Sequence, residues 1–149
     1  MEAVIFTGVQ GSGKSTFCKQ RFYETHIRIN LDMLRTKNRE RLLLSACLEA
    51  KQKFVIDKTN PTIEQRSKYI QLARSYHFRV IGYYFQSKLE DALRRNSQRE
   101  GKARIDERGI HGFLSRLQRP TLAEGFDELY YVWINENNEF VVETWIDEI

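Results

Sequence analysis

The sequence is poor in the residues that build linkers and metal clusters. It has only two prolines and eight glycines among 149 residues, which excludes a long flexible linker, and it shows no internal repeat or low-complexity run. Its two cysteines, Cys18 and Cys47, form no metal-binding pattern. With 41% hydrophobic residues, the composition predicts a single globular domain over residues 1–149.

Long apolar runs are missing as well. No stretch approaches the roughly 20 residues that a membrane-spanning helix needs, and the first residues resemble a core strand more than a signal peptide. Two cysteines without a framework are typical of a reducing compartment. We therefore expect a soluble cytoplasmic protein with no membrane partner.

Basic residues are missing from the end of the chain, where Arg119 is the last of them. Residues 1–119 hold all 24 lysines and arginines and 12 of the 20 acidic residues, whereas residues 120–149 hold eight acids and no base. Such polarity favours a polyanionic partner for the basic part. Solvated helix faces around a phosphate site would account for the same charge equally well.

The first residues contain the pattern of a nucleotide phosphate loop. The apolar run from Ala3 to Phe6 is typical of a buried strand and leads directly into G-x-x-x-x-G-K-[ST]. The expected binding residues are Gly8, Gln10, Gly11, Ser12, Gly13, Lys14, Ser15 and Thr16. Glycines let backbone N–H groups point at phosphate oxygens, and the following helix adds its positive end. Lys14 is then expected on the β- and γ-phosphates and Ser15 on Mg²⁺.

Strands and helices alternate along the rest of the chain. The periodicity predicts strands in 25–31, 53–57, 78–85, 127–134 and 140–146, and helices over 14–24, 37–50, 63–76, 88–99 and 106–118. In the helix over 37–50, the buried face is expected to be Leu42, Leu43, Ala46, Cys47 and Ala50. The alternation predicts a three-layer α/β/α P-loop NTPase, kinase-like, with a central mainly parallel sheet. Ligands should bind at the carboxyl ends of its strands.

The sequence outside the phosphate loop indicates which type of P-loop protein this is. The guanine-reading motif N-K-x-D of GTPases is absent, and the chain is too short for a large mechanical ATPase. A basic helix and break late in a short domain indicate a phosphotransferase with a helical lid at about 95–110. Arg95 and Arg99 are four residues apart, so both can point at one anion. A solvated basic helix is the competing interpretation, because Arg94, Lys102 and Arg104 crowd the same region.

Asp32 follows the second predicted strand, on the acceptor side of the phosphate loop. A kinase needs a base within hydrogen-bond reach of the attacking hydroxyl, and Asp32 is placed to accept that proton. Arg35 lies three residues on and is placed to hold an acceptor phosphate or to orient Asp32. An aspartate that caps the backbone at a helix start fits the spacing equally well.

A second polar group ends the third predicted strand. Asp57 is placed to hold the Mg²⁺ shell through water, with Thr59 and Asn60 at the same edge. Turn formation is the competing explanation, since Asn before Pro favours turns.

Several stretches together resemble the 5′-hydroxyl polynucleotide kinases, from about residue 3 to about residue 133. Ile29-Asn30-Leu31-Asp32-Met33-Leu34-Arg35 is similar to I-N-R-D-x-x-R, Val55 to Pro61 to V-I-D-N-T-N-P, Leu93 to Arg99 to the lid segment K-R-N-S-K-R, and Pro120 to Phe126 matches P-T-L-A-E-G-F. The motifs occur in the family's order. The sequence departs from the pattern at three positions, Leu31, Lys58 and Arg104.

The resemblance implies roles for these positions. Asp32 would be the general base for a 5′-hydroxyl, Arg35, Thr59 and Asn60 would contact the acceptor strand, and Arg95 and Arg99 would be lid arginines on the donor phosphates. It implies ATP as donor, Mg²⁺ as cofactor, and a 5′-OH end of DNA or RNA as acceptor, in nucleic-acid end healing. No D-x-D-x-[TV] phosphatase motif and no ligase lysine motif occurs. Phosphatase or ligase partners would then lie on other polypeptides or on other parts of a parent protein.

Two other functions fit the phosphate loop. One is a small-molecule kinase of the same fold, acting on a nucleoside, a sugar or a nucleotide-sugar. The other is a nucleic-acid-binding protein that uses ATP only as a switch. A small-molecule kinase would turn over a free nucleoside equally well and depend little on strand length or salt, whereas an ATP-switch protein would keep its binding and output after Asp32→Asn.

Overall fold

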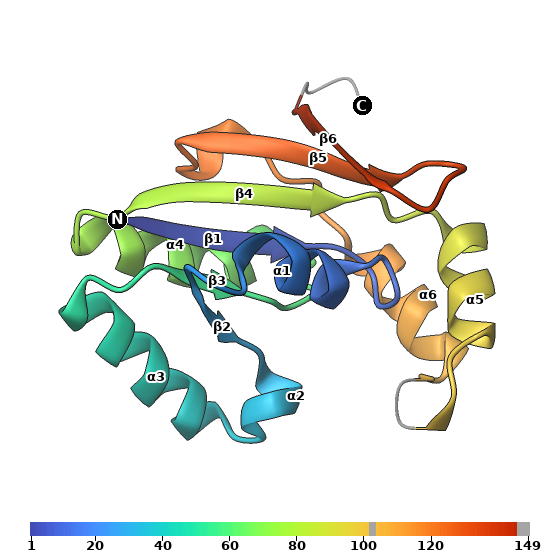
Figure 1. Ribbon diagram of the computed structural model, residues 1–149, viewed down its shortest axis with the longest axis horizontal. Coiled ribbons are helices and arrows are strands. Elements are labelled where there is room, and N and C mark those ends of the chain that lie inside the picture. The colour runs from blue at the N-terminus through green and yellow to red at the C-terminus, as the bar shows by residue number, and fades with distance from the viewer. Residues whose placement is uncertain (102–103, 146–149) are drawn as a thin grey trace.

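The computed structural model describes residues 1–101 and 104–145, whose strands form one sheet in the order β2-β3-β1-β4-β5-β6. The strands are β1 (Glu2–Thr7), β2 (Ile27–Ile29), β3 (Phe54–Ile56), β4 (Arg79–Phe85), β5 (Glu128–Ile134) and β6 (Phe140–Thr144). Strands β1 to β5 run parallel, and β6 pairs antiparallel with β5 (Figure 1). The prediction of a mainly parallel sheet is therefore confirmed.

Helices cover both faces of this sheet. They are α1 (Lys14–Phe22), α2 (Leu31–Leu34), α3 (Lys37–Ala50), α4 (Ile63–Ser75), α5 (Leu89–Ser97), α6 (Glu107–Arg116) and the 3₁₀ helix η2 (Leu122–Glu124). Helices α3 and α4 pack on the face that presents Ala3 and Ile5, whereas α1 packs on the face that presents Val4 and Phe6. This is the three-layer α/β/α arrangement that the alternating pattern predicted.

Helices α5 and α6 stand side by side at the end of the sheet toward which β1 and β4 point (Figure 1). They form their own small core, in which Ala92 of α5 and Ile110 and Phe113 of α6 pack against Val9. Because Val9 belongs to the loop after β1, this contact places the predicted lid directly beside the predicted phosphate loop.

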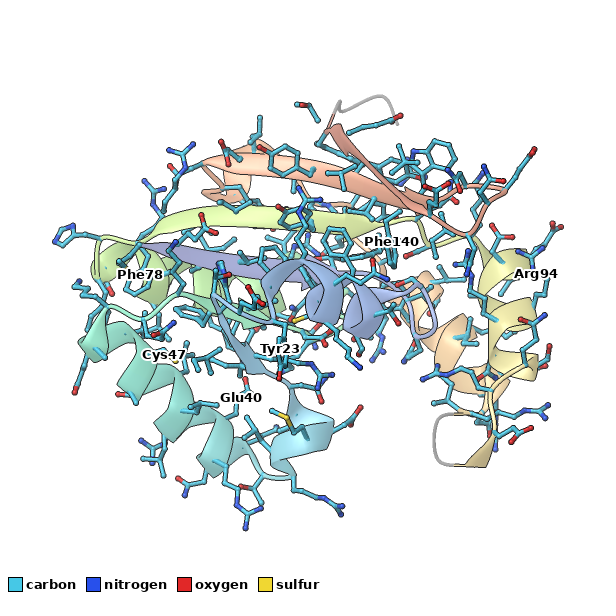
Figure 2. The ribbon with its side chains drawn as sticks, viewed as in Figure 1. Tyr23, Glu40, Cys47, Phe78, Arg94 and Phe140 are labelled. Atoms are coloured by element: carbon cyan, nitrogen blue, oxygen red, sulfur yellow. The ribbon has the colours of Figure 1, made fainter. Side chains whose placement is uncertain are left out.

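The predicted buried face of α3 is wrong in part, although the helix itself has the predicted bounds and Cys47 is buried as expected. Leu42 is 53% exposed and Ala46 is also exposed, whereas Glu40, Leu44, Cys47 and Leu48 are buried. Glu40 and Cys47 lie on the side of α3 that faces the rest of the molecule (Figure 2).

The rotation of α3 has a local cause. Because Leu42, Leu43 and Leu44 are consecutive, the apolar pattern fits two buried faces that differ by one residue. The burial of the polar residue Glu40 determines which face packs inward. Glu40 accepts hydrogen bonds from the Lys58 ammonium, 3.3 Å away, and from the Tyr69 hydroxyl. Burial of a paired carboxylate thus overrides the apolar pattern.

Other boundaries differ by a few residues at element ends. The strand predicted over 25–31 is only Ile27–Ile29, at the edge of the sheet. Thr62 caps α4 as expected, because its hydroxyl accepts a hydrogen bond from the Gln65 N–H at 3.2 Å. Lys102 and the last residue of the strand predicted over 140–146 lie outside the described residues. Among the helices at 1–101 and 104–145, none has the length and apolar character to span a bilayer.

Candidate active site

The sheet order brings the separate sequence motifs to one edge. Strand β3 lies between β1 and β2, so the residues after β3 and β2 meet the loop that follows β1. One cleft of about 1260 Å³ opens there and is lined by the phosphate loop, α2, the segment after β3, and α5. Its lining includes Gln10, Gly11, Gly13, Lys14, Ser15, Thr16, Asp32, Asp57, Thr59, Arg95 and Arg99.

The phosphate loop has a conformation that depends on its glycines. Gly11 and Gly13 have φ angles of +79° and +98°, which side chains rarely adopt. A Cβ atom on Gly13 would also lie 2.9 Å from a ring carbon of Phe140. Phe140 is the first residue of β6 and lies beside the first turns of α1 (Figure 2).

Lys14 is buried at the centre of the loop, with 9% of its surface exposed. Its ammonium donates hydrogen bonds to the carbonyl oxygens of Gly8 and Val9, at 2.9 and 3.0 Å. Burial lowers the pKa of Lys14 to about 8, against the opposing attraction of Asp57. The loop thus holds a poorly solvated cation, for which a phosphate anion would be a strong partner.

Ser15 and Asp57 lie together at the start of α1. The Ser15 hydroxyl donates to Asp57 Oδ2 at 3.2 Å, and the Asp57 side chain is 1% exposed. A hydroxyl and a carboxylate are hard oxygen ligands of the kind that Mg²⁺ prefers, with phosphates and waters completing its shell. Among residues 1–101 and 104–145 no cluster of three or more His, Cys, Asp or Glu side chains suits a metal.

Arg99 approaches the phosphate loop from the end of α5. Its Nη1 atom is buried without a hydrogen-bond partner in the described part of the chain, and it lies 3.6 Å from the Cβ position of Gly11. An unpartnered guanidinium nitrogen is costly unless it receives an acceptor. Its position above the loop fits an oxygen of a bound phosphate.

The segment that carries Arg95 and Arg99 is anchored by Asn96. The Asn96 side chain is 1% exposed; its amide donates to Ile105 O at 2.7 Å and its oxygen accepts from Ile105 N at 2.9 Å. These two bonds tie α5 to the residue that precedes the Asp106 cap of α6. Arg95 and Arg94 also line the cleft, and Arg94 pairs there with Asp91 at 3.1 Å.

Asp32 lies in α2, exposed, on the wall of the cleft opposite α5. The cap of this helix is Asn30, whose Oδ1 accepts from Met33 N at 2.9 Å. The Asp32 carboxylate itself makes no hydrogen bond within residues 1–101 and 104–145. Asn30, and not Asp32, therefore caps this helix. The negative charge of Asp32 acts on Lys14 and raises its pKa, against the larger effect of burial.

The other predicted acceptor residues are placed differently. Thr59 lines the cleft, and its carbonyl accepts from Gly8 N at 3.0 Å. Asn60 is buried, and its side chain donates to Phe6 O at 2.8 Å instead of lining the cleft. Arg35 ends α2 with a φ of +74° and is exposed outside the cleft lining. The structure thus brings Thr59 to Asp32 and Lys14, but not the side chains of Asn60 and Arg35.

Two groups at the site were missed by the sequence reasoning. Arg28 of β2 donates to Asp57 Oδ2 at 2.8 Å. The β5–β6 turn and the strand ends beside it place Ile134, Asn135, Glu136, Asn138 and Phe140 along the cleft. In the sequence, the one indication that Arg28 belongs to the site was its place between Ile27 and Ile29 in a strand pattern. No sequence pattern placed the β5–β6 turn at the site, because its position depends on the order of the strands in the sheet.

The sequence of this chain matches the model of a known protein family. Residues 33–120 match the AAA domain family, a stretch that begins within α2 and contains α3, the segment after β3, and the lid. The chain belongs to the AAA domain family. Together with the phosphate loop, this places it among P-loop proteins of the kinase type.

One curated relative is a bifunctional polynucleotide phosphatase/kinase of Schizosaccharomyces pombe, 35% identical over 132 residues. The match covers 84% of this chain and 32% of that protein, so the chain spans about a third of the length of the relative.

Solved structures with low identity show the same fold. Kti12 of Chaetomium thermophilum, in complex with ADP-AlF3, has a TM-score of 0.67 and 14% identity, and the match covers 91% of this chain and 92% of that one. A sugar kinase from Janibacter sp. has a TM-score of 0.64 and 20% identity, with 88% and 85% covered. The AAA-domain chain therefore has a P-loop kinase fold, with a mostly parallel central sheet.

Proposed function

We propose that this chain is an ATP- and Mg²⁺-dependent kinase that phosphorylates the 5′-hydroxyl end of DNA or RNA. The observation that carries the proposal is the unengaged Asp32 carboxylate, which faces Lys14 and the phosphate loop across one cleft. Support for a polynucleotide acceptor comes from the 35% identical relative named a polynucleotide phosphatase/kinase.

In the proposed reaction, Asp32 removes the proton of the 5′-hydroxyl as its oxygen attacks the γ-phosphorus of ATP. The bond between the γ-phosphorus and the bridging oxygen breaks, and ADP leaves with that oxygen. Lys14 and the loop N–H groups hold the negative charge of the phosphates, and Arg99 and Arg95 cover them from the lid. Mg²⁺, held by Ser15 and through water by Asp57, would neutralise phosphate charge.

The proposed acceptor is a single nucleic-acid end held mainly through its phosphates. All lysines and arginines precede residue 120, so the acceptor strand would lie on the basic part of the chain. Phosphate contacts make binding tolerant of sequence and sensitive to salt. Phosphatase and ligase steps would belong to other chains or other parts of a parent protein.

The test offers γ-labelled ATP with three acceptors: a 5′-OH oligonucleotide, the same oligonucleotide with a 5′-phosphate, and a free nucleoside. We expect label on the 5′-OH oligonucleotide alone. Label on the nucleoside alone would instead identify a small-molecule kinase.

The variant Asp32→Asn separates catalysis from binding. It should lower transfer by about 10²-fold or more, the contribution typical of a general base, while ATP binding stays near wild type. The matched control is Glu49→Gln, which removes a carboxylate from an exposed position of α3 and should leave transfer unchanged. Near-normal transfer by Asp32→Asn would refute the assignment of the base.

A further inference from the structure

Arg28 is the basic residue in contact with both oxygen groups of the proposed metal site. Its Nε donates to Asp57 Oδ2 at 2.8 Å, and its Nη2 donates to Ser15 Oγ at 3.1 Å. The Ser15 hydroxyl in turn donates to the same carboxylate oxygen at 3.2 Å. One guanidinium therefore bridges the two groups that the proposed function assigns to Mg²⁺.

The position of Arg28 follows from the sheet. It lies at the centre of the three-residue edge strand β2, which pairs with β3 just before Asp57. The Arg28 side chain is 35% exposed, whereas that of Asp57 is 1% exposed. The guanidinium thus reaches a buried carboxylate from the solvent side.

The contact between Arg28 and Asp57 affects how strongly a cation can bind the carboxylate. Arginine stays protonated at all ordinary pH values and presents its N–H groups as a rigid fork. It therefore supplies a permanent positive charge at Asp57 Oδ2. A divalent cation that shares the carboxylate meets repulsion from this charge and from the nearby Lys14.

We propose that Arg28 is a built-in counter-ion, a positioning residue that holds Ser15 and Asp57 in place and competes with a divalent cation for Asp57. The proposal rests on the metal site of the proposed function. In the absence of nucleotide, Arg28 satisfies the buried carboxylate and keeps metal affinity low. The phosphates of a nucleotide add negative charge, so the cation binds together with the nucleotide rather than before it.

The probe is Mn²⁺, followed by the paramagnetic resonance signal of the free ion, with the full chain and no nucleotide. A neighbouring arginine changes the proton affinity of a carboxylate by about 10- to 1,000-fold, and the same repulsion acts on a metal ion. Arg28→Gln should therefore bind Mn²⁺ at least about 10-fold more tightly than wild type. Arg28→Lys keeps the charge and should stay within about threefold of wild type.

Two controls assign the effect to this site. Arg41→Gln removes an exposed arginine from α3, whose side chain donates to Asn38 Oδ1 at 2.8 Å, and should leave Mn²⁺ affinity unchanged. In an Asp57→Asn background, Arg28→Gln should no longer raise the affinity. Equal or weaker Mn²⁺ binding by folded Arg28→Gln would overturn the proposal, as would a gain that persists in Asp57→Asn.

A measurement on the wild-type chain covers the case in which Arg28→Gln does not fold. The Nε–H resonance of Arg28, assigned by its loss in Arg28→Lys, should shift when Mg²⁺ and a non-hydrolysable ATP analogue are added together. A resonance that stays in place while the analogue binds would overturn the proposal. Failure of the oligonucleotide assay would count against the kinase function alone, because neither measurement here involves phosphate transfer.

Discussion

Replacing Glu124 by alanine should destabilise the chain strongly, because Glu124 neutralises a fully buried arginine. Arg66 of α4 has 0% exposure. Its Nε and Nη2 donate to Glu124 Oε1 and Oε2 at 2.8 and 3.1 Å. Its other contacts are the carbonyl oxygens of Asn60 at 2.9 Å and Gln118 at 2.8 Å. The pair therefore joins α4 to the segment after β3 and to the chain beyond α6.

The expected loss follows from the charge that is left behind. Removing one partner of a buried ion pair costs about 3–5 kcal/mol, because the other charge stays buried without compensation. In a domain of this size each kcal/mol lowers Tm by about 2–4 °C. Glu124→Ala should thus melt about 6–20 °C below wild type. Its midpoint in urea should fall at an unchanged slope.

Controls distinguish a buried charge from a general loss of packing. Glu49→Gln, on the exposed side of α3, should change the free energy of unfolding by less than about 0.5 kcal/mol. The double variant Arg66→Met/Glu124→Leu should be more stable than Glu124→Ala, since neither charge is left unpaired. A loss below about 1 kcal/mol for Glu124→Ala, or a double variant less stable than the single one, would refute this reasoning.

Two further predictions concern the donor side of the cleft. Folded Lys14 loses its proton at about pH 8, whereas the unfolded lysine keeps it to 10.5. The unfolded state then binds more protons, so the stability of wild type relative to Lys14→Met should rise by about 3 kcal/mol between these pH values; equal pH profiles in urea melts would contradict this. Asn96→Ala removes both bonds to Ile105 and should speed tryptic cleavage after Arg99 and Arg104 by about tenfold, whereas Ser97→Ala should not; equal cleavage rates would count against the anchor.

The sequence by itself determined the phosphate loop and the alternation of strands and helices. These depend on residues that are close together in the chain: Gly13 needs its φ of +98° whatever surrounds it, and Thr62 caps α4 through a residue three positions on. Asp32 was also found this way, because its place after a strand implies the carboxyl edge of the sheet.

Only the tertiary structure decided which side chains complete the site. The pairing of Arg28 with Asp57 and of Arg66 with Glu124, and the burial of Glu40, join residues far apart in the sequence. Their meeting depends on the order of the strands in the sheet, with β3 between β1 and β2 and β5 beside β4, which no local pattern encodes. The same order carried Asn60 into the interior and left Arg35 outside the cleft lining, since burial and hydrogen bonding over the whole sheet outweigh the spacing of a motif.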